Sequence, residues 1–317
     1  MPGYFHEPID RKQFLKSVTS IGTATLFSWR TACAQETTDD SAVPGNSTSA
    51  ATEEPTKPQF KVAMLSDTHI PVKSDEGYRN FSPQKNLTKV APQVVAAKPQ
   101  AVIVNGDAAR LDGQVGDYQK LRELLGPIAA VAPIHIGLGN HDDRGNFYQV
   151  FPADAEAKST QEVNGKHVSV IDTPVVRLIV LDSLLYVNKV AGLLGKNQRD
   201  WLTNYLPTAT DKPIALCVHH TLSDSDGSLL DADRLFRIIE PHKQVKAIFY
   251  GHSHRYEVTE QAGVRLINLP AIGYNFSDEQ PVGWVDASFH ESGVAMTLRT
   301  VAGNQNNNGK TTEVSWA

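Results

Sequence analysis

Short apolar runs rich in valine and isoleucine constrain the fold of this chain more than any other feature. Runs of this length that are apolar throughout are typical of strands buried on both faces of a sheet. They occupy residues 61–65, 101–104, 133–138, 175–181, 213–218 and 245–250. Helical patterns separate several of the runs, and this alternation predicts an α/β fold with a largely parallel central sheet. Beyond residue 255 the chain reads as further strands and turns.

Three helices are predicted from their capping residues and apolar faces. The first begins at the Ser-Pro pair of residues 82–83, a favourable N-cap and first turn, and Pro92 is expected to kink or shorten it. The second is expected to have Asp117 as its cap and to end at Gly126. The third covers residues 230–240, where apolar residues recur at helical spacing.

Five of the apolar runs are followed directly by side chains that can bind a metal. The segments in question are Ser66–His69, Asn105–Asp107, Gly139–Asp142, His219–His220 and Gly251–His254. In open α/β sheets the carboxyl ends of the strands line the ligand crevice. We therefore expect these polar groups to converge at one edge of the fold.

The types of side chain in these segments favour a metal site. Carboxylate and imidazole groups without a thiolate suit borderline divalent ions such as Mn, Fe or Zn. Asp67 and His69, like His252 and His254, are two residues apart. In extended backbone such pairs point to the same side and can share one ion. Glycines in the same segments permit tight turns and close backbone approach: Gly106, Gly139 and Gly251.

Each segment taken alone has a more ordinary explanation. Asp-x-His is a common tripeptide, Gly-Asp and Gly-Asn-His-Asp are typical of turns, and His-x-His occurs more often on surfaces than in metal sites. Five such segments at successive strand ends are not independent of one another. Together they favour the metal site.

The ordered set Asp-x-His, Gly-Asp, Gly-Asn-His-Asp, a strand-end His and Gly-His-x-His resembles the signature of the calcineurin-like metallophosphoesterases. It spans residues 67–254, most of the expected domain. The resemblance implies an α/β fold of two packed mixed β-sheets flanked by helices, in four layers α/β/β/α. It also implies a binuclear centre of two divalent metal ions that hydrolyses phosphoesters.

The resemblance implies a role for each polar residue of the motifs. The first metal would be held by Asp67, His69 and His254 and the second by Asn140, His219 and His252, with Asp107 bridging the two. His141 corresponds to the histidine assigned to leaving-group protonation or substrate binding. His220 is expected to be structural or to support the ligands from outside.

Further residues are candidates for the substrate pocket. Many family members carry Asp or Asn three residues after the bridging aspartate, where this chain has Arg110, with Asp112 two residues further on. Either Asp112 takes that role or Arg110 faces the phosphate. Arg144, Tyr274 and Asn275 could line the pocket, and each can equally be an ordinary loop residue.

Within the family, the Gly-Asn-His-Asp-Asp segment followed by Phe147 resembles the bacterial cyclic-nucleotide and glycerophosphodiester phosphodiesterases. We therefore expect hydrolysis of a small-molecule phosphodiester by attack of a metal-bound hydroxide, with His141 assisting the leaving group. One alternative is a phosphomonoesterase that scavenges phosphate. Another, from a different class, is a metal-binding module without turnover.

The N-terminal part is expected to lie outside the folded domain. Residues 1–34 have a basic start, a modestly apolar stretch and an Ala-Cys-Ala cleavage pattern, which predicts an export signal. The segment resembles a twin-arginine signal with Lys12 in place of the second arginine; a general secretory signal, lipid attachment at Cys33 and a tail without a targeting role are alternatives. Residues 35–58 lack large apolar side chains and predict a flexible linker. The domain is expected over 59–317, in an exported protein of the periplasm or cell surface.

Charge and cysteine content narrow the possible partners. The net charge is -5, and without a basic excess a broad nucleic-acid-binding face is not expected. The apolar stretch of the signal is too short and too polar for a transmembrane helix. Cys217 lies in an apolar run, which predicts a buried thiol and no structural disulfide.

Overall fold

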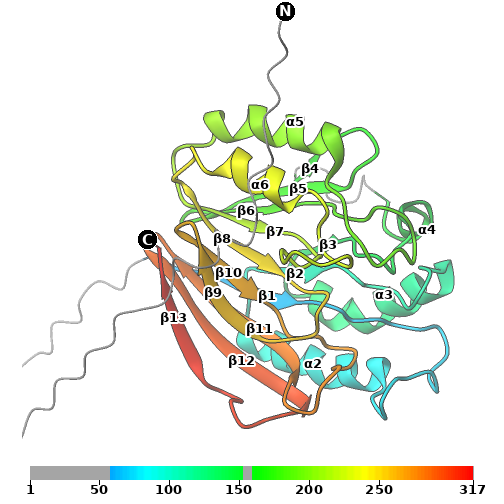
Figure 1. Cartoon of the computed structure of the whole chain (residues 1–317). Coiled ribbons are helices and arrows are strands. Elements are labelled where there is room, and N and C mark those ends of the chain that lie inside the picture. Colours follow the sequence, from blue (N-terminus) through cyan, green and yellow to red (C-terminus); the bar gives the residue numbers. More distant parts are fainter. Residues whose placement is uncertain (1–57, 153–158, 317) are drawn as a thin grey trace, which may run out of the picture. The chain divides into compact units, whose positions relative to one another are not determined.

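The computed structural model describes residues 58–152 and 159–316. Within them the chain forms two β-sheets, with helices on the outer side of each (Figure 1). The predicted export signal, 1–34, and the predicted linker, 35–58, lie outside the described residues apart from Pro58. Among the described residues, no helix combines the length and apolar character that crossing a bilayer requires.

The first sheet has six strands in the order β13-β12-β11-β1-β2-β3. Its strands are β1 Phe60–Leu65, β2 Ala101–Asn105, β3 Ile134–Gly137, β11 Pro281–His290, β12 Gly293–Gly303 and β13 Thr311–Ser315. Strands β1, β2 and β3 are parallel, whereas β11 pairs antiparallel with β1 and continues into the β12 and β13 meander. The C-terminal strands therefore complete a sheet that the N-terminal half begins.

The second sheet has seven strands in the order β4-β5-β6-β7-β8-β10-β9. Its strands are β4 Thr160–Gln161, β5 Val168–Asp172, β6 Arg177–Val180, β7 Ile214–Cys217, β8 Val245–Tyr250, β9 Glu257–Gln261 and β10 Val264–Asn268. The four central strands are parallel and the edges are antiparallel. The expectation of one largely parallel central sheet is therefore wrong, because the parallel strands are divided between two mixed sheets. The two-sheet architecture implied by the resemblance is confirmed.

The helices are longer than their breaker residues predict. Their bounds are α2 Pro83–Ala97, α3 Val115–Ala129, α4 Arg144–Val150, α5 Gly195–Tyr205, the short 3₁₀ helix η2 Leu206–Thr208, and α6 Ala232–Ile239. Helix α2 continues through Pro92, and α3 continues past Gly126. Both helices bury an apolar face against the first sheet, and this packing outweighs the local preference for a break. Asp117 is not the cap: it lies inside the first turn and accepts hydrogen bonds from the backbone of Gln114 and Val72.

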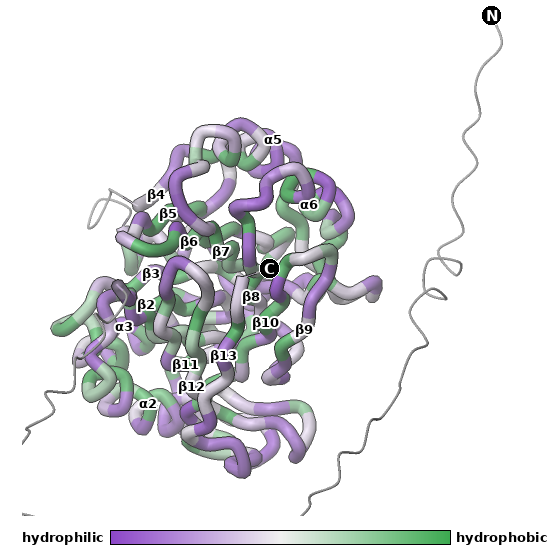
Figure 2. The backbone as a smooth tube through the Cα atoms, turned by 90° about the vertical axis from the view of Figure 1, so that its left-hand side faces the viewer, coloured by the Kyte–Doolittle hydropathy of each residue, from purple (hydrophilic) through white to green (hydrophobic). Residues whose placement is uncertain are grey.

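Three apolar cores separate the layers. One, which includes Leu121, joins α2 and α3 to the first sheet. A second lies between the sheets and contains Phe249 and Phe289, and a third, with Leu202 and Leu235, joins α5 and α6 to the second sheet. Figure 2 shows the hydrophobic stretches concentrated in the strands. The result is the four-layer α/β/β/α arrangement, and the free thiol of Cys217 is buried in the middle core as predicted.

Candidate metal centre

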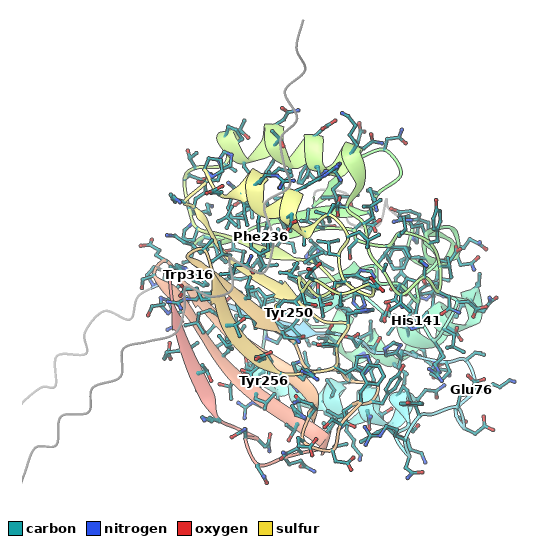
Figure 3. The ribbon with its side chains drawn as sticks, in the orientation of Figure 1. Glu76, His141, Phe236, Tyr250, Tyr256 and Trp316 are labelled. Atoms are coloured by element: carbon teal, nitrogen blue, oxygen red, sulfur yellow. The ribbon has the colours of Figure 1, made fainter. Side chains whose placement is uncertain are left out.

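The polar segments that follow β1, β2, β3, β7 and β8 converge where these strands end. Backbone hydrogen bonds tie the segments together: Asp67 N donates to Gly106 O at 3.1 Å, and Gly251 N donates to His219 O at 2.9 Å. The Asn105 amide reaches across to the Val218 carbonyl of the second sheet at 3.1 Å. Figure 3 labels His141 among these loops. The predicted convergence is confirmed.

Two groups of potential ligands lie side by side. In the first, Nε2 of His254 lies 3.3 Å from Oδ1 of Asp67 and 3.1 Å from Nε2 of His69. In the second, Nε2 of His219 lies 3.3 Å from Oδ2 of Asp107, and His252 completes the group within 4.8 Å. Asp107 Oδ2 is also 3.7 Å from His69 Nε2, so this carboxylate stands between the groups.

Unpartnered buried atoms show that the site fits metal ions. Members of both ligand groups line a cavity of about 190 Å³, which we call the metal cavity. Asn140 also lines it and is 2% exposed, and its Oδ1 has no hydrogen-bond partner. Nε2 of His219 is equally buried and faces carboxylate oxygens of Asp107 and Asp67, at 3.3 and 3.9 Å. Buried polar atoms are normally satisfied, and an amide oxygen and an imidazole nitrogen are both suitable ligands for divalent ions.

The backbone brings the paired residues together by a different route from the one expected. Asp67 and His69 have φ values of 51° and 47°, and His252 and His254 have 68° and 52°. These values belong to the left-handed region, so the expectation of extended backbone in these pairs is wrong. The side chains converge because the chain folds over the sheet edge immediately after each strand. Such conformations are unfavourable for residues other than glycine and persist where surrounding structure enforces them.

Two glycines are required by the close approach of the loops. A Cβ atom on Gly139 would overlap Oδ1 of Asp107, and one on Gly251 would lie 2.5 Å from Oδ2 of Asp67. No side chain fits at either position without displacing a carboxylate of the site. The interpretation of these glycines as close-approach residues is confirmed.

Carbonyl groups orient two of the imidazole rings. Nδ1 of His219 lies 2.9 Å from the carbonyl of Asn105, and Nδ1 of His254 lies 2.6 Å from the carbonyl of Tyr274. A ring that donates its Nδ1–H to a carbonyl keeps Nε2 free as a metal ligand. Nδ1 of His69 has no such partner. The His69 ring instead stacks on the ring of Tyr274, with the two centroids 4.7 Å apart.

The electrostatics of the site favour bound cations. Burial opposes ionisation of Asp107, yet the neighbouring His219 holds the pKa of this carboxyl well below its usual range. Burial also works against a charged His219, but Asp107 and Asp67 outweigh it and raise the pKa of this imidazole to about 10. Burial lowers the pKa of His69 to about 3. Two carboxylates that can hold a proton on a buried imidazole provide the negative potential that a divalent ion needs.

His141 stands at the open side of the ligand groups. Its backbone N donates to Oδ1 of Asp107 at 2.9 Å, and its ring Nδ1 lies 2.6 Å from the carbonyl of Leu111. The ring lines the cavity, with its centroid 5.3 Å from that of His69. These contacts leave Nε2 available to a substrate, as the resemblance implied.

The structure separates the candidate substrate residues. Arg110 is half-buried beside the cavity, with Cζ 5.8 Å from the ring centre of Tyr274, and its Nε has no partner. Asp112 is exposed and accepts a hydrogen bond from Gln114 at 3.0 Å. Arg144 does not line the cavity, because its guanidinium is paired with both oxygens of buried Asp182. Of these three residues, Arg110 is the one placed to approach a phosphate.

The remaining candidates also divide. Tyr274 lines the cavity, whereas the Asn275 amide is turned away to donate to the carbonyl of Gln280 at 2.7 Å. His220 is fully buried, and its Nδ1 lies 2.7 Å from the Ser183 hydroxyl. This contact agrees with the supporting role expected for His220.

Asp142 supports the site, although no role for it was predicted from the sequence. It is fully buried, and its carboxylate accepts hydrogen bonds from the backbone of Ala108, Ala109 and Gly139 at 2.8–3.1 Å and from the Tyr118 hydroxyl at 3.0 Å. The residue therefore fixes the loop of Asp107 to the loop of His141. Its position in the Gly-Asn-His-Asp motif was visible, but a carboxylate in a turn is ordinarily exposed.

Fold and site together define a dimetal hydrolase of phosphoric esters. A family model described as calcineurin-like phosphoesterase matches residues 60–256. The chain belongs to the calcineurin-like phosphoesterase family, and its cofactors are two divalent metal ions.

Curated relatives and solved structures agree with this assignment. A glycerophosphodiester phosphodiesterase of Enterobacter lignolyticus is 28% identical, over 69% of this chain and 81% of the relative. A 3',5'-cyclic adenosine monophosphate phosphodiesterase of Pseudomonas aeruginosa is 24% identical, over 68% of this chain and 77% of the relative. A dimetal phosphatase from Danio rerio has the same fold, with a TM-score of 0.64 and 13% identity over 81% of this chain and 99% of the other.

Proposed function

We propose that this enzyme hydrolyses small-molecule phosphodiesters. One observation carries the proposal: a second cavity of about 640 Å³ adjoins the metal cavity, and the two share His252, His254 and Phe276 in their walls. A diester carries an organic group on each side of its phosphate and needs space on both. The diesterase names of the two curated relatives support the same substrate class.

The residues that would hold the metals follow from the two ligand groups. Asp67, His69 and His254 would bind the first ion and Asn140, His219 and His252 the second, with Asp107 shared between them. When bound, two such ions neutralise phosphate oxygens and lower the pKa of coordinated water. The protein's own part is to exclude bulk water and to hold the phosphate against His141.

His141 is placed to help the leaving group depart. The contact of its Nδ1 with the Leu111 carbonyl fixes the ring, and in its imidazolium form the ring can donate a proton from Nε2 to the departing alcohol oxygen. Arg110 lies beside Tyr274, its Nε has no partner, and it can contact a phosphate oxygen from that side. Asp142 keeps both loops in position.

Hydrolysis of bis(p-nitrophenyl) phosphate and of p-nitrophenyl phosphate, with Mn or Zn and with chelator, tests the proposal. We expect chelator-sensitive turnover with a clear preference for the diester. Turnover of the monoester alone would establish the phosphatase alternative, and no turnover of either would leave a binding module. His254→Ala should abolish activity, and His290→Ala, a partly exposed histidine bonded to Ser292, is the matched control.

We also propose that residues 1–34 direct export, so that the enzyme acts in the periplasm or at the cell surface. The basic start, the apolar stretch and the Ala-Cys-Ala pattern support this location. A reporter that becomes fluorescent only outside the cytoplasm, fused after residue 40, gives the test. Retention of the fusion in the cytoplasm would refute export, and loss of export on replacing Arg11 and Lys12 would identify the twin-arginine route.

A further inference from the structure

Large apolar side chains gather around the mouth of the metal cavity. Eight such side chains stand exposed among the described residues, and four of them lie here. The four are Tyr78 at 46% exposed, Leu111 at 45%, Val190 at 55% and Phe276 at 54%. We call them the apolar rim. Single exposed apolar residues are ordinary, but a group of them at one opening marks a binding surface.

Contacts tie each member of the rim to the site. Val190 and Phe276 line the metal cavity directly, and the Phe276 ring stacks on His254 with centroids 4.2 Å apart and planes at 18°. Tyr78 lies 4.9 Å from Tyr274, which also lines the cavity, and 6.3 Å from Phe276. These ring contacts hold Tyr78 and Phe276 in fixed orientations while about half of each side chain remains open to solvent.

Leu111 completes the rim on the side of His141. Its carbonyl is the group that holds the His141 ring, at 2.6 Å, so the backbone of Leu111 is fixed while its side chain is exposed. The rim therefore extends from His141, the candidate proton donor, to Phe276, whose ring covers His254 of the first ligand group. An organic group attached to a phosphate at the metals can pack against the rim.

The second cavity offers many hydrogen-bonding side chains beside its apolar ones. About half of its lining residues carry a hydroxyl or amide group, among them Thr221, Ser223, Ser253, Asn268 and Gln280. Phe276 borders both spaces. The surroundings of the phosphate thus offer an apolar contact on one side and hydrogen-bonding groups on the other.

We infer that the apolar rim is a binding subsite for an apolar ester group of the substrate. This inference rests on the proposed function and deepens it. The substrate is an unsymmetrical phosphodiester: one ester group, a flat ring or an alkyl chain without charge, packs on Phe276, Val190, Tyr78 and Leu111. The other group carries hydroxyls and faces the polar cavity. Fixed aromatic side chains bind such a group with little loss of conformational entropy.

Competitive inhibition by phosphonates tests the rim separately from the reaction. Phenylphosphonate and methylphosphonate have the same anionic group and a P–C bond that the enzyme's hydrolysis does not cleave, so they differ only in the apolar substituent. We expect phenylphosphonate to bind about tenfold more tightly, from the apolar area that its ring buries. Hexylphosphonate distinguishes the two forms of the ester group, because tighter binding than phenylphosphonate identifies a chain and weaker binding identifies a ring.

Substitutions in the rim test whether its side chains cause the tighter binding of phenylphosphonate over methylphosphonate. Phe276→Ala should reduce the ratio of the two inhibition constants to about twofold, and Val190→Ser should reduce it by about half. Val131→Ser is the matched control, because Val131 is 52% exposed but follows α3 and does not line either cavity. Inhibition constants do not depend on the fraction of active enzyme, so partial misfolding of a variant cannot mimic the effect.

The outcomes separate this inference from the proposed function. The ratio is measured with whichever ester the enzyme hydrolyses, and calorimetric titration of the metal-loaded enzyme gives the same ratio without turnover. A diesterase with equal affinity for the two phosphonates would overturn the rim and leave the proposed function standing. A ratio that Val131→Ser lowers as much as Val190→Ser would also overturn it. An enzyme that prefers monoesters but shows the tenfold ratio would overturn the proposed function and retain an apolar subsite.

Discussion

The core between the two sheets and the edge where their strands end differ in charge and in backbone conformation, although the chain passes from one to the other within three residues at the end of β8. Phe249 lies within β8, fully buried among apolar neighbours. His252, just beyond the strand, has a φ of 68°, and its ring lies within 4.8 Å of the Asp107 carboxylate. The core is relaxed and uncharged, whereas the edge collects left-handed backbone, buried charge and unpartnered polar atoms.

The contrast teaches that the edge depends on the core for its stability. Burial of the carboxylates of Asp67 and Asp107 is unfavourable, although His219 offsets part of this cost, and the left-handed residues add strain. Apolar burial in the three cores offsets both costs. Substitutions at the edge should therefore remove activity and spare the fold, and substitutions in the core should do the reverse.

The largest expected effect comes from the shared carboxylate. Asp107→Asn removes a negative charge from between the two ligand groups while keeping the shape of the side chain. We expect kcat/KM for the diester to fall at least about 1000-fold. Circular dichroism should show an unchanged fold, and a variant with more than a tenth of the wild-type activity would contradict the shared position of Asp107.

A core substitution should show the opposite behaviour. Phe249→Ala removes a fully buried ring from between the sheets and should lower the free energy of unfolding by about 3–5 kcal/mol. Denaturant titration measures this loss. At low temperature, where the variant is folded, kcat should remain within about threefold of wild type because the ring does not contact the site. A large fall in kcat would show that the two regions are not separable.

Asp142 tests the boundary between the regions, because it is buried like the core and charged like the edge. Asp142→Ala leaves several buried backbone donors without an acceptor and should cost about 2–4 kcal/mol of unfolding free energy. It should also lower kcat by about 10–100-fold, since the loops of Asp107 and His141 lose their common anchor. Loss of stability without loss of kcat would make Asp142 a residue of the core alone.

The smallest effect concerns the buried thiol. Burial raises the pKa of Cys217 to about 12, so at pH 8 the group is in its protonated form and the reactive thiolate is scarce. In a Cys33→Ser variant, whose sole cysteine is Cys217, a maleimide should label the folded protein far more slowly than the denatured protein. Rapid labelling in native buffer would show that the core opens locally.

Much of the site could be predicted because its residues directly follow strands. The apolar runs indicate where β1, β2, β3, β7 and β8 end, so the convergence of the five polar segments follows from the sequence. The grouping of Asp67 with His254 came only from the family resemblance, because β1 and β8 belong to different sheets. Arg144 could not be placed in this way. Its direction depends on Asp182, a residue far along the chain whose burial no local pattern reveals.

The fold was predictable to a similar depth. Strands that are apolar throughout were found, whereas α5 was missed because it buries few residues, Gln198 and Leu202 among them, and shows little apolar periodicity. Helix α2 continues through Pro92 because its buried face packs on the first sheet. The apolar rim was missed for a related reason: Tyr78, Leu111, Val190 and Phe276 come from four separate loops, and only the tertiary structure brings them to one opening.

Each ligand group draws residues from both sheets. Asp67 and His69 follow β1 of the first sheet, while their partner His254 follows β8 of the second; Asp107 likewise follows β2, and its partner His219 follows β7. Ions bound there act as cross-links across the sandwich, closing it at the end where the strained loops lie. By mass action, a cofactor at about 100 times its dissociation constant adds about 2.7 kcal/mol to the free energy of unfolding. The metal-loaded enzyme should therefore resist unfolding better than the metal-free protein, and one titration with metal would change stability and activity together.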